Sequence, residues 1–479
     1  MGRLRSLAVI FIFPFLYCYH DEEPLPKGYY PELYTAEITV DPDYDASVTD
    51  MPPVRHATEL RKGRLLKGTV AMDIIVTEEI SILQFHSGMR VDLNEVLIDG
   101  EPIETERDHV GSRLIIDKKL AKGPHRIVVE YETKKSGGLY RMQKENNTMN
   151  SVYTKGGEFG THHYVPCLND PDRKAKWKVS IEYPPGYFAL SNGKVSSYLT
   201  GSRFFKNGAK TEFELTPKMS PHLFTFLITK YPKFTRIAKT GQELNIYSTN
   251  PSKAEALLQM LTDSFDYLAA IFKPAYPLAK LDVFLEPSIG WAMEHWGLIV
   301  YGGNPDRSIM QHLVAHQWFG NLVSPSAWKH AWLSEGFATY WEKQVAKQAP
   351  ATFERELNIV IDNDRGLEPM VLEPFVTEVV LRRNPWLRYE KGACLLKMIE
   401  GMIGQQPLID AMNKYLEKYQ YEAVETSLFF DELLPAFDKI KDKMDGISIQ
   451  ELGKQWTTQP GIPTINEFQD SLVKPFFRR

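Results

Sequence analysis

Two histidines four residues apart, His312 and His316, have a spacing that suits metal chemistry. Side chains at this spacing project from one face of a helix, one turn apart, so both imidazoles can reach one ion. Taken alone, the pair would favour two unrelated helix histidines, because 12 histidines in 479 residues make chance pairs common. Glu335, nineteen residues beyond His316, changes that assessment. Two histidines and a carboxylate leave a fourth position for water or substrate, so they predict one catalytic-type zinc site.

The predicted zinc residues fall in a region with helical periodicity that begins after residue 250. Residues 252–272 place Leu257, Leu261 and Phe265 on one face. Further helices are predicted near 306–322, 333–347, 386–403, 406–418 and 428–440. We therefore expect a mainly helical domain over 250–465, followed by a tail over 466–479.

The preceding region, residues 30–249, has the pattern of a large β domain. Runs of β-branched and aromatic residues occur at 70–76, 126–131 and 223–228. Turn residues such as those at 184–186 separate them. A β domain followed by a helical domain defines an α+β fold class.

Length and composition agree with a globular protein of two or three domains. Hydrophobic residues make up 43% of the chain and charged residues 24%, which argues against long disordered regions. The formal net charge is −5, and no block of basic residues occurs. Nucleic acid is therefore excluded as an expected partner.

The N-terminus resembles a targeting segment. Arg3 and Arg5 precede an apolar run over 7–17, which Pro14 interrupts. A spanning helix needs about 20 apolar residues, so we expect residues 1–20 to be a secretory signal peptide, with an uncleaved signal anchor as the alternative. The protein is accordingly expected to be secreted, or otherwise anchored to a membrane by this segment.

Two further features bear on secretion. Residues 146–148 form one glycosylation sequon, which predicts a glycoprotein. Cys18 lies in the segment expected to be removed, which leaves Cys167 and Cys394. We expect both to be buried thiols, although a bridge between them stays open at this stage.

Several motifs together resemble the gluzincin aminopeptidases, the family of membrane alanyl aminopeptidase and leukotriene hydrolase. Residues 316–323 and 332–338 resemble its zinc segment, 292–297 its Gly-x-Met-Glu-Asn loop, 389–393 the segment of its catalytic tyrosine, and 166–171 a β-domain signature. The resemblance covers about residues 30 to 465. It implies an N-terminal β domain followed by a thermolysin-like zinc domain.

The resemblance also implies roles for individual residues. The two histidines and Glu335 would bind one zinc ion. Glu294, with Ala292 and Met293 beside it, would bind the free α-amine of a peptide. Tyr389 would donate a hydrogen bond to the oxyanion of the transition state. The alternatives are a solvated loop carboxylate for Glu294 and a packed core aromatic for Tyr389.

The family motif is His-Glu-x-x-His, and in this chain Leu313 occupies the glutamate position. The family's glutamate takes a proton from the attacking water and passes it to the leaving amine, and leucine can do neither. Such general acid–base help contributes about 10²–10⁴-fold, or about 3–5 kcal/mol of barrier. Leu313 extends the apolar stripe that begins at Ile309, so we expect the helix to fold and peptide hydrolysis to be lost or strongly impaired.

Other departures from the family pattern support this expectation. Trp291 occupies the glycine position of the substrate loop, where an indole should narrow or plug the groove. His295 replaces the loop's asparagine, and residues 329–330 replace an Asn-Asp pair ahead of Glu335. These changes remove groups that would orient the zinc ligands and reduce the negative charge that attracts the metal.

Residues 456–463 resemble the end of the family's catalytic domain, and 16 residues follow. Larger members continue into a β-sandwich and a helical domain that closes the cleft. We therefore expect a shortened member without those domains, whose surface beside the zinc is open and polar or paired with another chain.

Three functions fit these observations. The favoured one is a non-catalytic, secreted homologue that binds peptide N-termini or a protein partner. The second is an active zinc aminopeptidase, and the third is an interaction protein in which zinc is only a structural staple. Retained Glu294 and Tyr389 favour the first two, whereas Trp291 and Leu313 disfavour the second.

Overall fold

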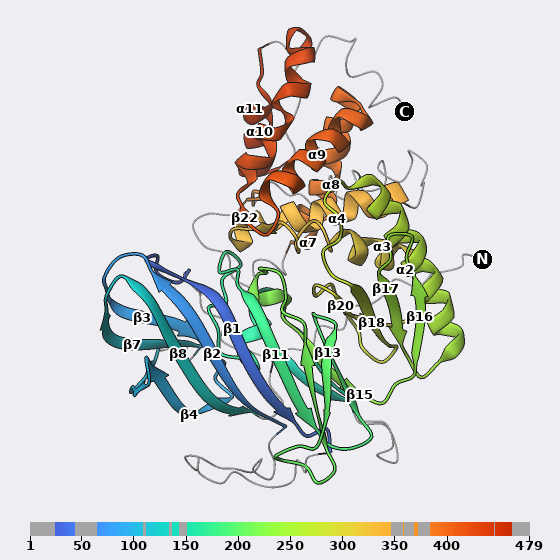
Figure 1. The fold of residues 1–479 in the computed structure, drawn as a ribbon. Coiled ribbons are helices and arrows are strands. Elements are labelled where there is room, and N and C mark those ends of the chain that lie inside the picture. The colour runs from blue at the N-terminus through green and yellow to red at the C-terminus, as the bar shows by residue number, and fades with distance from the viewer. Residues whose placement is uncertain are drawn as a thin grey trace, which may run out of the picture.

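The computed structural model describes residues 24–43, 65–108, 112–133, 137–142, 151–345, 358, 368–371, 384–444 and 446–461. Figure 1 shows a β domain below, a smaller sheet with helices beside it, and a helical region above. This arrangement confirms the predicted α+β class, with the β domain first and the helical domain second. The targeting segment, Cys18 and the sequon at 146–148 lie outside the described residues.

The β domain contains three sheets. The largest has the order β13 (Val195–Thr200), β14 (Ala209–Phe213), β11 (Lys176–Tyr183), β1 (Tyr29–Val40), β2 (Leu66–Val76), β8 (Gly123–Thr133), β4 (Val91–Ile98), β5 (Glu101–Pro102). The second has the order β12 (Phe188–Ser191), β15 (Phe226–Thr229), β10 (Ser151–Thr154), β9 (Leu139–Met142). The third joins β3 (Ile80–His86), β7 (Arg113–Leu120) and β6 (Glu106–Arg107).

An aromatic stack lies at the centre of the β-domain core. The Tyr34 and Trp177 rings stack at 4.1 Å between centroids, and Trp177 stacks on Phe224 at 4.2 Å. All three side chains are fully buried. Tyr34 of β1 and Trp177 of β11 are register partners in a parallel pair of strands, which places their rings side by side.

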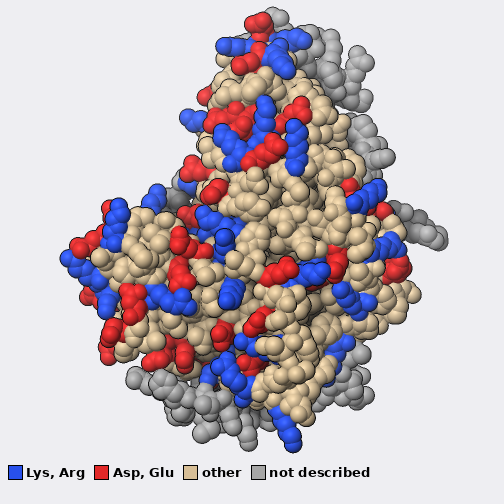
Figure 2. All heavy atoms as spheres, viewed as in Figure 1, with Lys and Arg blue, Asp and Glu red and all other residues tan. Residues whose placement is uncertain are grey.

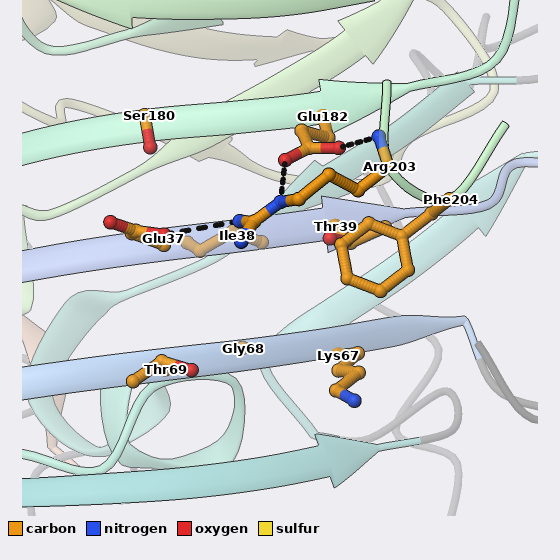
Figure 3. Close-up of a pocket in the computed structure, with 10 residues that line it drawn as sticks. All are labelled: Glu37, Ile38, Thr39, Lys67, Gly68, Thr69, Ser180, Glu182, Arg203 and Phe204. Carbon is orange, nitrogen blue, oxygen red and sulfur yellow. Dashed lines mark hydrogen bonds and ion pairs between the residues drawn. The ribbon is translucent and has the colours of Figure 1, made fainter. Parts of the chain in front are cut away.

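The outer face of the large sheet carries a shallow pocket lined from β1, β2 and β11 (Figure 3). Arg203 reaches across it, with its guanidinium 3.3 Å from Glu37 Oε2 and 3.3 Å from Glu182 Oε1. Arg203 balances one of the two carboxylates, and Lys67, which also lines the pocket, carries a second positive charge.

A separate five-stranded sheet lies beside the β domain. Its order is β16 (Lys233–Ile237), β17 (Glu243–Tyr247), β18 (Lys280–Glu286), β20 (Leu298–Gly302), β19 (Ala292–Met293). Helix α2 (Pro251–Ile271) begins at the Asn250 cap, whose side chain accepts a hydrogen bond from Lys253 N. The strands β16 and β17 precede residue 250, so the boundary predicted there falls inside this sheet.

The remaining elements form the helical part and the connections to it. The helices are α1 (Gly157–Gly160), α3 (Arg307–Ala315), α4 (Trp332–Val345), α7 (Pro385–Arg388), α8 (Glu390–Ile403), α9 (Gln405–Tyr419), α10 (Thr426–Phe437) and α11 (Ile449–Thr458). Short 3₁₀ turns are η2 (Thr161–His163), η3 (Pro221–Leu223), η4 (Trp328–His330) and η5 (Asp438–Lys443), and β21 (Ser324–Pro325) pairs with β22 (Ala423–Val424).

The helix predicted over 306–322 ends at Ala315. Gly320 has a φ of +112°, which no other residue type adopts readily. A Cβ at this position would also lie 2.2 Å from Ser334 Oγ. The chain therefore turns back here and brings the segment after His316 against α4.

Two surface observations complete the fold. In the part of the chain that the structure describes, no helix combines the length and hydropathy needed to cross a membrane. On the face shown in Figure 2, acidic and basic side chains are interspersed. Cys167 and Cys394 are both buried thiols, as predicted.

Candidate metal centre

The two histidines come together at the C-terminal end of α3. Asp306 caps the start of this helix by accepting hydrogen bonds from Ser308 N and Ile309 N. His312 lies in the last turn, and His316 is the residue that ends the helix. Their Nε2 atoms are 2.9 Å apart, as the four-residue spacing predicts.

Glu335 approaches both histidines from the first turn of α4. Its Oε2 atom lies 3.2 Å from His316 Nε2 and 3.4 Å from His312 Nε2. This oxygen is buried and has no hydrogen bond of good geometry within the described part of the chain. The three side chains thus form a group with the donor types and closeness that a metal ion requires.

The outer nitrogen of each imidazole faces an acceptor. His316 Nδ1 lies 3.1 Å from the Phe319 carbonyl oxygen, and His312 Nδ1 lies 3.4 Å from Glu342 Oε2. When each Nδ1 atom carries the hydrogen and donates it to its acceptor, both Nε2 atoms have a lone pair for one ion. Without an ion, a proton shared between the two Nε2 atoms, 2.9 Å apart, takes that place. The residues present therefore fit a bound metal.

The electrostatics of the group favour positive charge. Burial lowers the pKa of His312, but the hydrogen bonds and charges of Glu335 and Glu342 outweigh it and raise the pKa to about 10. Burial would raise the pKa of Glu335, yet His316 and His312 together lower it well below its usual range. A cation is therefore stabilised at this position.

Glu342 was missed by the sequence reasoning. It lies two helical turns beyond Glu335 on α4, on the same face, and it positions the ring of His312 from behind. A carboxylate on the outer nitrogen of a metal-binding histidine fixes the ring and raises its basicity. The seven-residue spacing between the two glutamates was the available signal.

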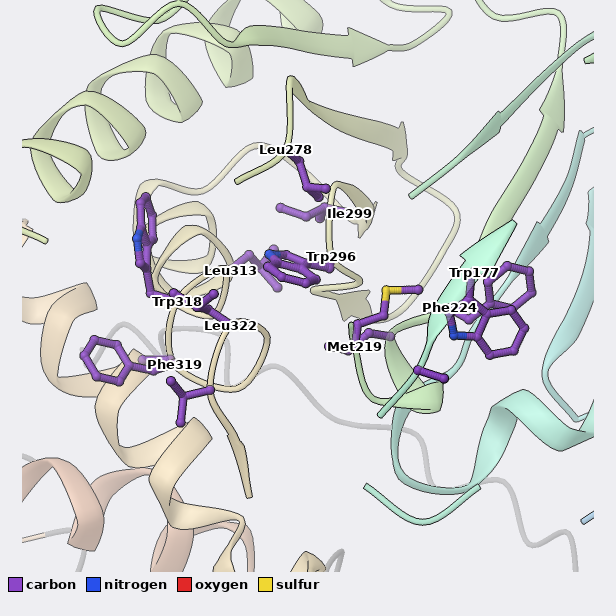
Figure 4. Close-up of a cluster of buried hydrophobic side chains, with 14 of the residues drawn as sticks. Trp177, Met219, Phe224, Leu278, Trp296, Ile299, Leu313, Trp318, Phe319 and Leu322 are labelled. Atoms are coloured by element: carbon purple, nitrogen blue, oxygen red, sulfur yellow. The ribbon is translucent and has the colours of Figure 1, made fainter. Parts of the chain in front are cut away.

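Leu313 lies between the two histidines in the sequence, on helix α3. Its side chain is 3% exposed and belongs to the apolar core. Figure 4 shows it beside Trp296, with Leu278 and Ile299 on the same side of the cluster. The position of the family's proton carrier is thus occupied by a hydrocarbon side chain within the apolar core.

The backbone of Glu294 is fastened to the segment that follows the histidines. Its carbonyl oxygen accepts hydrogen bonds from Asn321 Nδ2 at 2.8 Å and Gln317 Nε2 at 3.1 Å. Gln317 Oε1 also accepts from Gly297 N at 3.2 Å. These two amides, which the sequence reasoning did not single out, tie the loop that contains Ala292, Met293 and Glu294 to the metal group. Their position within the motif at 316–323 was the available signal.

Tyr389 lies beside the metal group. Its ring stacks on the ring of His312, with 5.7 Å between centroids and 10° between planes. It occupies the junction between α7 and α8, where it ends the first helix and begins the second. The structure thus brings the predicted tyrosine next to a predicted zinc ligand, while its role as an oxyanion donor stays a prediction.

The substituted residues of the loop are part of the packing. Trp291 contacts Tyr140 and Tyr153, at centroid distances of 5.6 and 6.1 Å. His295 is buried and accepts a hydrogen bond at Nε2 from Gly156 N at 2.9 Å. Burial, aided by the charge of Lys155, lowers the pKa of His295 to about 3, so the ring is neutral. Whether Trp291 narrows the groove stays a prediction.

The pair at 329–330 lies in η4, just ahead of α4. The buried His330 has its Nδ1 atom 2.9 Å from Thr426 Oγ1, and Trp332 Nε1 donates to the same hydroxyl oxygen at 2.9 Å. His330 therefore helps to join α4 to α10, and this contact contributes to positioning Glu335 through the helix.

A buried lysine from the β domain supports the metal segment from the other side. Lys174 is 3% exposed, and its ammonium donates to the carbonyl oxygens of Asn321 and Leu322 at 3.3 and 3.2 Å. Burial lowers the pKa of Lys174 to about 7. The turn after His316 is thus held by both domains.

A His-His-Glu group on two packed helices, between a β domain and a helical domain, is typical of zinc metallopeptidases. The comparisons with known proteins agree. The Peptidase M1 N-terminal domain matches residues 34–223, and the Peptidase family M1 domain matches residues 257–456. Together these matches cover most of the chain, and the chain belongs to peptidase family M1, whose members are zinc-dependent aminopeptidases.

Three individual relatives share between 26% and 29% of aligned residues with this chain. Glutamyl aminopeptidase of Homo sapiens is 28% identical over 86% of this chain and 46% of its own length. Aminopeptidase N of Haemonchus contortus is 29% identical over 94% of this chain and 50% of its own length. Aminopeptidase Q of Homo sapiens is 26% identical over 92% of this chain and 50% of its own length. The chain spans about half the length of these relatives.

Proposed function

We propose that this protein is a zinc-binding M1 homologue that captures peptides by their free N-termini and hydrolyses them slowly or not at all. The observation that carries the proposal is Leu313, which is 3% exposed and packed in the apolar core where the family has its proton carrier. A hydrocarbon side chain accepts no proton, so about 10²–10⁴-fold of rate is lost.

The retained groups support binding. The Glu294 carboxylate would pair with the α-ammonium of a peptide, and Gln317 and Asn321 fix the backbone of that residue. Tyr389 would donate a hydrogen bond to the carbonyl oxygen of the bound residue. Zinc held by His312, His316 and Glu335 would supply Lewis acidity toward that same carbonyl. These groups together can orient a peptide without cleaving it.

The alternative is an active zinc aminopeptidase. It is favoured by the three closely grouped ligands and by the stacking of Tyr389 on His312. The Glu342 carboxylate lies near His312 Nδ1, on the side of the ring away from Nε2. It is therefore on the wrong side to transfer a proton for a substrate bound near Nε2. Glu294 is the other carboxylate that the motifs place near the metal group, and its proposed pairing with the α-ammonium leaves it unavailable for proton transfer.

The deciding experiment measures metal content and turnover in the same preparation. Elemental analysis should find about one zinc per chain, and aminoacyl amides should be cleaved at least about 100-fold more slowly than by active family members. Turnover within about tenfold of those members would establish the alternative. Absence of zinc would instead favour a purely structural or interaction protein.

We also propose that the protein is secreted, or anchored by its N-terminal segment, and that a protein partner bound on another surface is the other candidate ligand. N-terminal sequencing of protein exported by eukaryotic cells would test the first point. Cleavage near residue 20 is expected, and an intact Met1 on membrane-bound protein would favour the anchor.

A further inference from the structure

Lys174 crosses from the β domain to the turn of residues 319–323, at the junction of the two domains. Its side chain is buried, and the ammonium donates to the carbonyl oxygens of Asn321 and Leu322. Lysine head groups usually reach water even when their stems are covered. This one ends inside the junction, where a charge is costly to keep.

Neither carbonyl group depends on this lysine for a hydrogen bond. Leu322 O also accepts from Tyr421 N at 2.8 Å. Asn321 O also accepts from Ser324 Oγ, at the longer distance of 3.5 Å. A hydrocarbon side chain of similar length would leave each oxygen with a donor and would bury no charge. The need for hydrogen-bond donors therefore does not account for an ammonium at this position.

Lys174 differs in its surroundings from another lysine that joins the two domains. Lys280 has Asp282 Oδ2 at 2.8 Å, besides its two carbonyl acceptors. No carboxylate pairs with Lys174 in the part of the chain that the structure describes. A buried ammonium without a counter-charge tends to lose its proton, because the neutral amine costs less to keep away from water.

The charged groups that face Lys174 leave burial as the main influence on it. Burial lowers the pKa of Lys174 to about 7, while the charge of Glu422 raises this pKa and that of Lys218 lowers it. His222, on η3, also faces the ammonium, and burial lowers the pKa of its own ring to about 3, so the ring is neutral. In water, a lysine amine holds its proton up to about pH 10.4.

We infer that Lys174 makes the junction between the two domains sensitive to protons, so that the junction holds more firmly when this side chain is neutral and loosens when it is protonated. Opening exposes the amine to water, where it binds a proton more tightly than it does inside the junction. Closure is therefore increasingly favoured as the pH rises from about 7 toward about 10. Because the turn of residues 319–323 follows His316, the same proton controls how firmly the metal segment is held.

The experiment is hydrogen–deuterium exchange of the full-length protein, with zinc in the buffer, at pH 6 and pH 8.5. Mass spectrometry of peptides that cover residues 317–325 reports the opening of the turn without requiring peptide capture or turnover. After correction for the intrinsic rise of the exchange rate with pH, protection of the wild type should increase about tenfold. One proton released on closure allows up to about tenfold per pH unit above the pKa of the buried amine.

Two variants separate the proton from the contact. Lys174→Met cannot be protonated, so its protection should be the same at both pH values and at least as high as that of the wild type at pH 6. Lys174→Arg keeps its charge at both pH values, so its protection should also be constant and should not exceed that of the wild type at pH 6. Lys174→Gln, which is also uncharged, provides the same comparison if Lys174→Met does not fold, and thermal unfolding verifies the folding of each variant.

The matched control is Lys218→Gln, which removes a surface lysine 3.8 Å from Glu422 and should retain the increase seen in the wild type. Equal protection of the wild type at both pH values would overturn the inference. An increase of the same size in Lys174→Met would assign the proton to another group and would also overturn it.

Discussion

His312 lies between two carboxylates, with Glu335 near its Nε2 atom and Glu342 near its Nδ1 atom. One carboxylate joins the histidines in holding a cation, and the other fixes the ring that does so. Because the two glutamates lie on one face of α4, the position of this one helix determines how far each carboxylate lies from His312. The affinity of the site therefore depends on a residue that would not itself touch the metal.

The first prediction concerns Glu342. Replacing it with glutamine removes the charge behind His312 but keeps the shape, so the imidazole becomes a weaker donor. Zinc affinity should fall about 10- to 100-fold, measured by competition with a chelator. Glu432→Gln, which removes a surface partner of Lys418, is the control and should have no effect. Unchanged affinity in Glu342→Gln would show that the contact is incidental.

The second prediction concerns Leu313. Leu313→Glu supplies a proton carrier but buries a carboxylate beside Trp296 unless it turns toward the histidines. Hydrolysis of an alanyl amide should rise by less than about tenfold, and should rise further when Trp291→Gly is added. Leu313→Gln introduces a side chain with the shape of glutamate but without its basic group, so it should give no gain in hydrolysis. Full recovery of turnover by the single change would contradict the predicted obstruction at Trp291.

At the scale of elements, the sequence predicted the strongly periodic segments well. Helix α2 was expected over 252–272 and spans Pro251–Ile271. The end of α3 was predicted too late, because the turn at Gly320 depends on α4 packing against it. Strands β16 and β17 were grouped with the β domain because strand patterns do not reveal which sheet a strand will join.

The candidate site was likewise predicted only in part. The motifs predicted which residues the two helices would bring together, since a four-residue spacing has only one outcome in a helix. They did not reveal Glu342 or Lys174, because the first lies outside every motif and the second comes from the other domain. Contacts made only after the domains pack leave no periodic trace in the sequence.

The third prediction tests the connection between the substrate loop and the β domain. Gly297 has a φ of +79°, and a Cβ there would lie 2.5 Å from the Asn192 carbonyl oxygen. Gly303 has nearly the same φ, +78°, with nothing within 4 Å. Gly303→Ala should cost about 1 kcal/mol of unfolding free energy from backbone strain alone. Gly297→Ala should cost about 3 kcal/mol, measured by denaturant titration. Equal losses would show that the loop yields to the clash.

At the scale of the whole molecule, buried neutral histidines predict sensitivity to acid. Burial lowers the pKa of both His222 and His295 to about 3. In the unfolded chain these groups bind a proton below about pH 6.5, whereas the folded protein resists protonation down to about pH 3. The unfolded state thus binds more protons in this window, and stability falls as the pH falls.

The fourth prediction follows from this difference. Lowering the pH from about 7.5 to about 5 should reduce the unfolding free energy, with each of these histidines contributing on the order of 2 kcal/mol. His295→Asn, which keeps an acceptor for Gly156 N, should make the pH dependence shallower. Denaturant titrations at both pH values measure the effect. A variant with the same pH dependence as the wild type would exclude His295 as a source.

Polar contacts join the two domains at two places, the turn after His316 and the loop of residues 291–297. Lys174 reaches from the β domain to the turn after His316, and Lys280 donates to Ser191 O at 2.6 Å and Gly297 O at 2.8 Å. A ligand entering at this junction meets a surface that is already shaped, so little ordering of the protein is needed on binding. Association should therefore be limited by diffusion and orientation, and its rate should decrease in proportion to solvent viscosity.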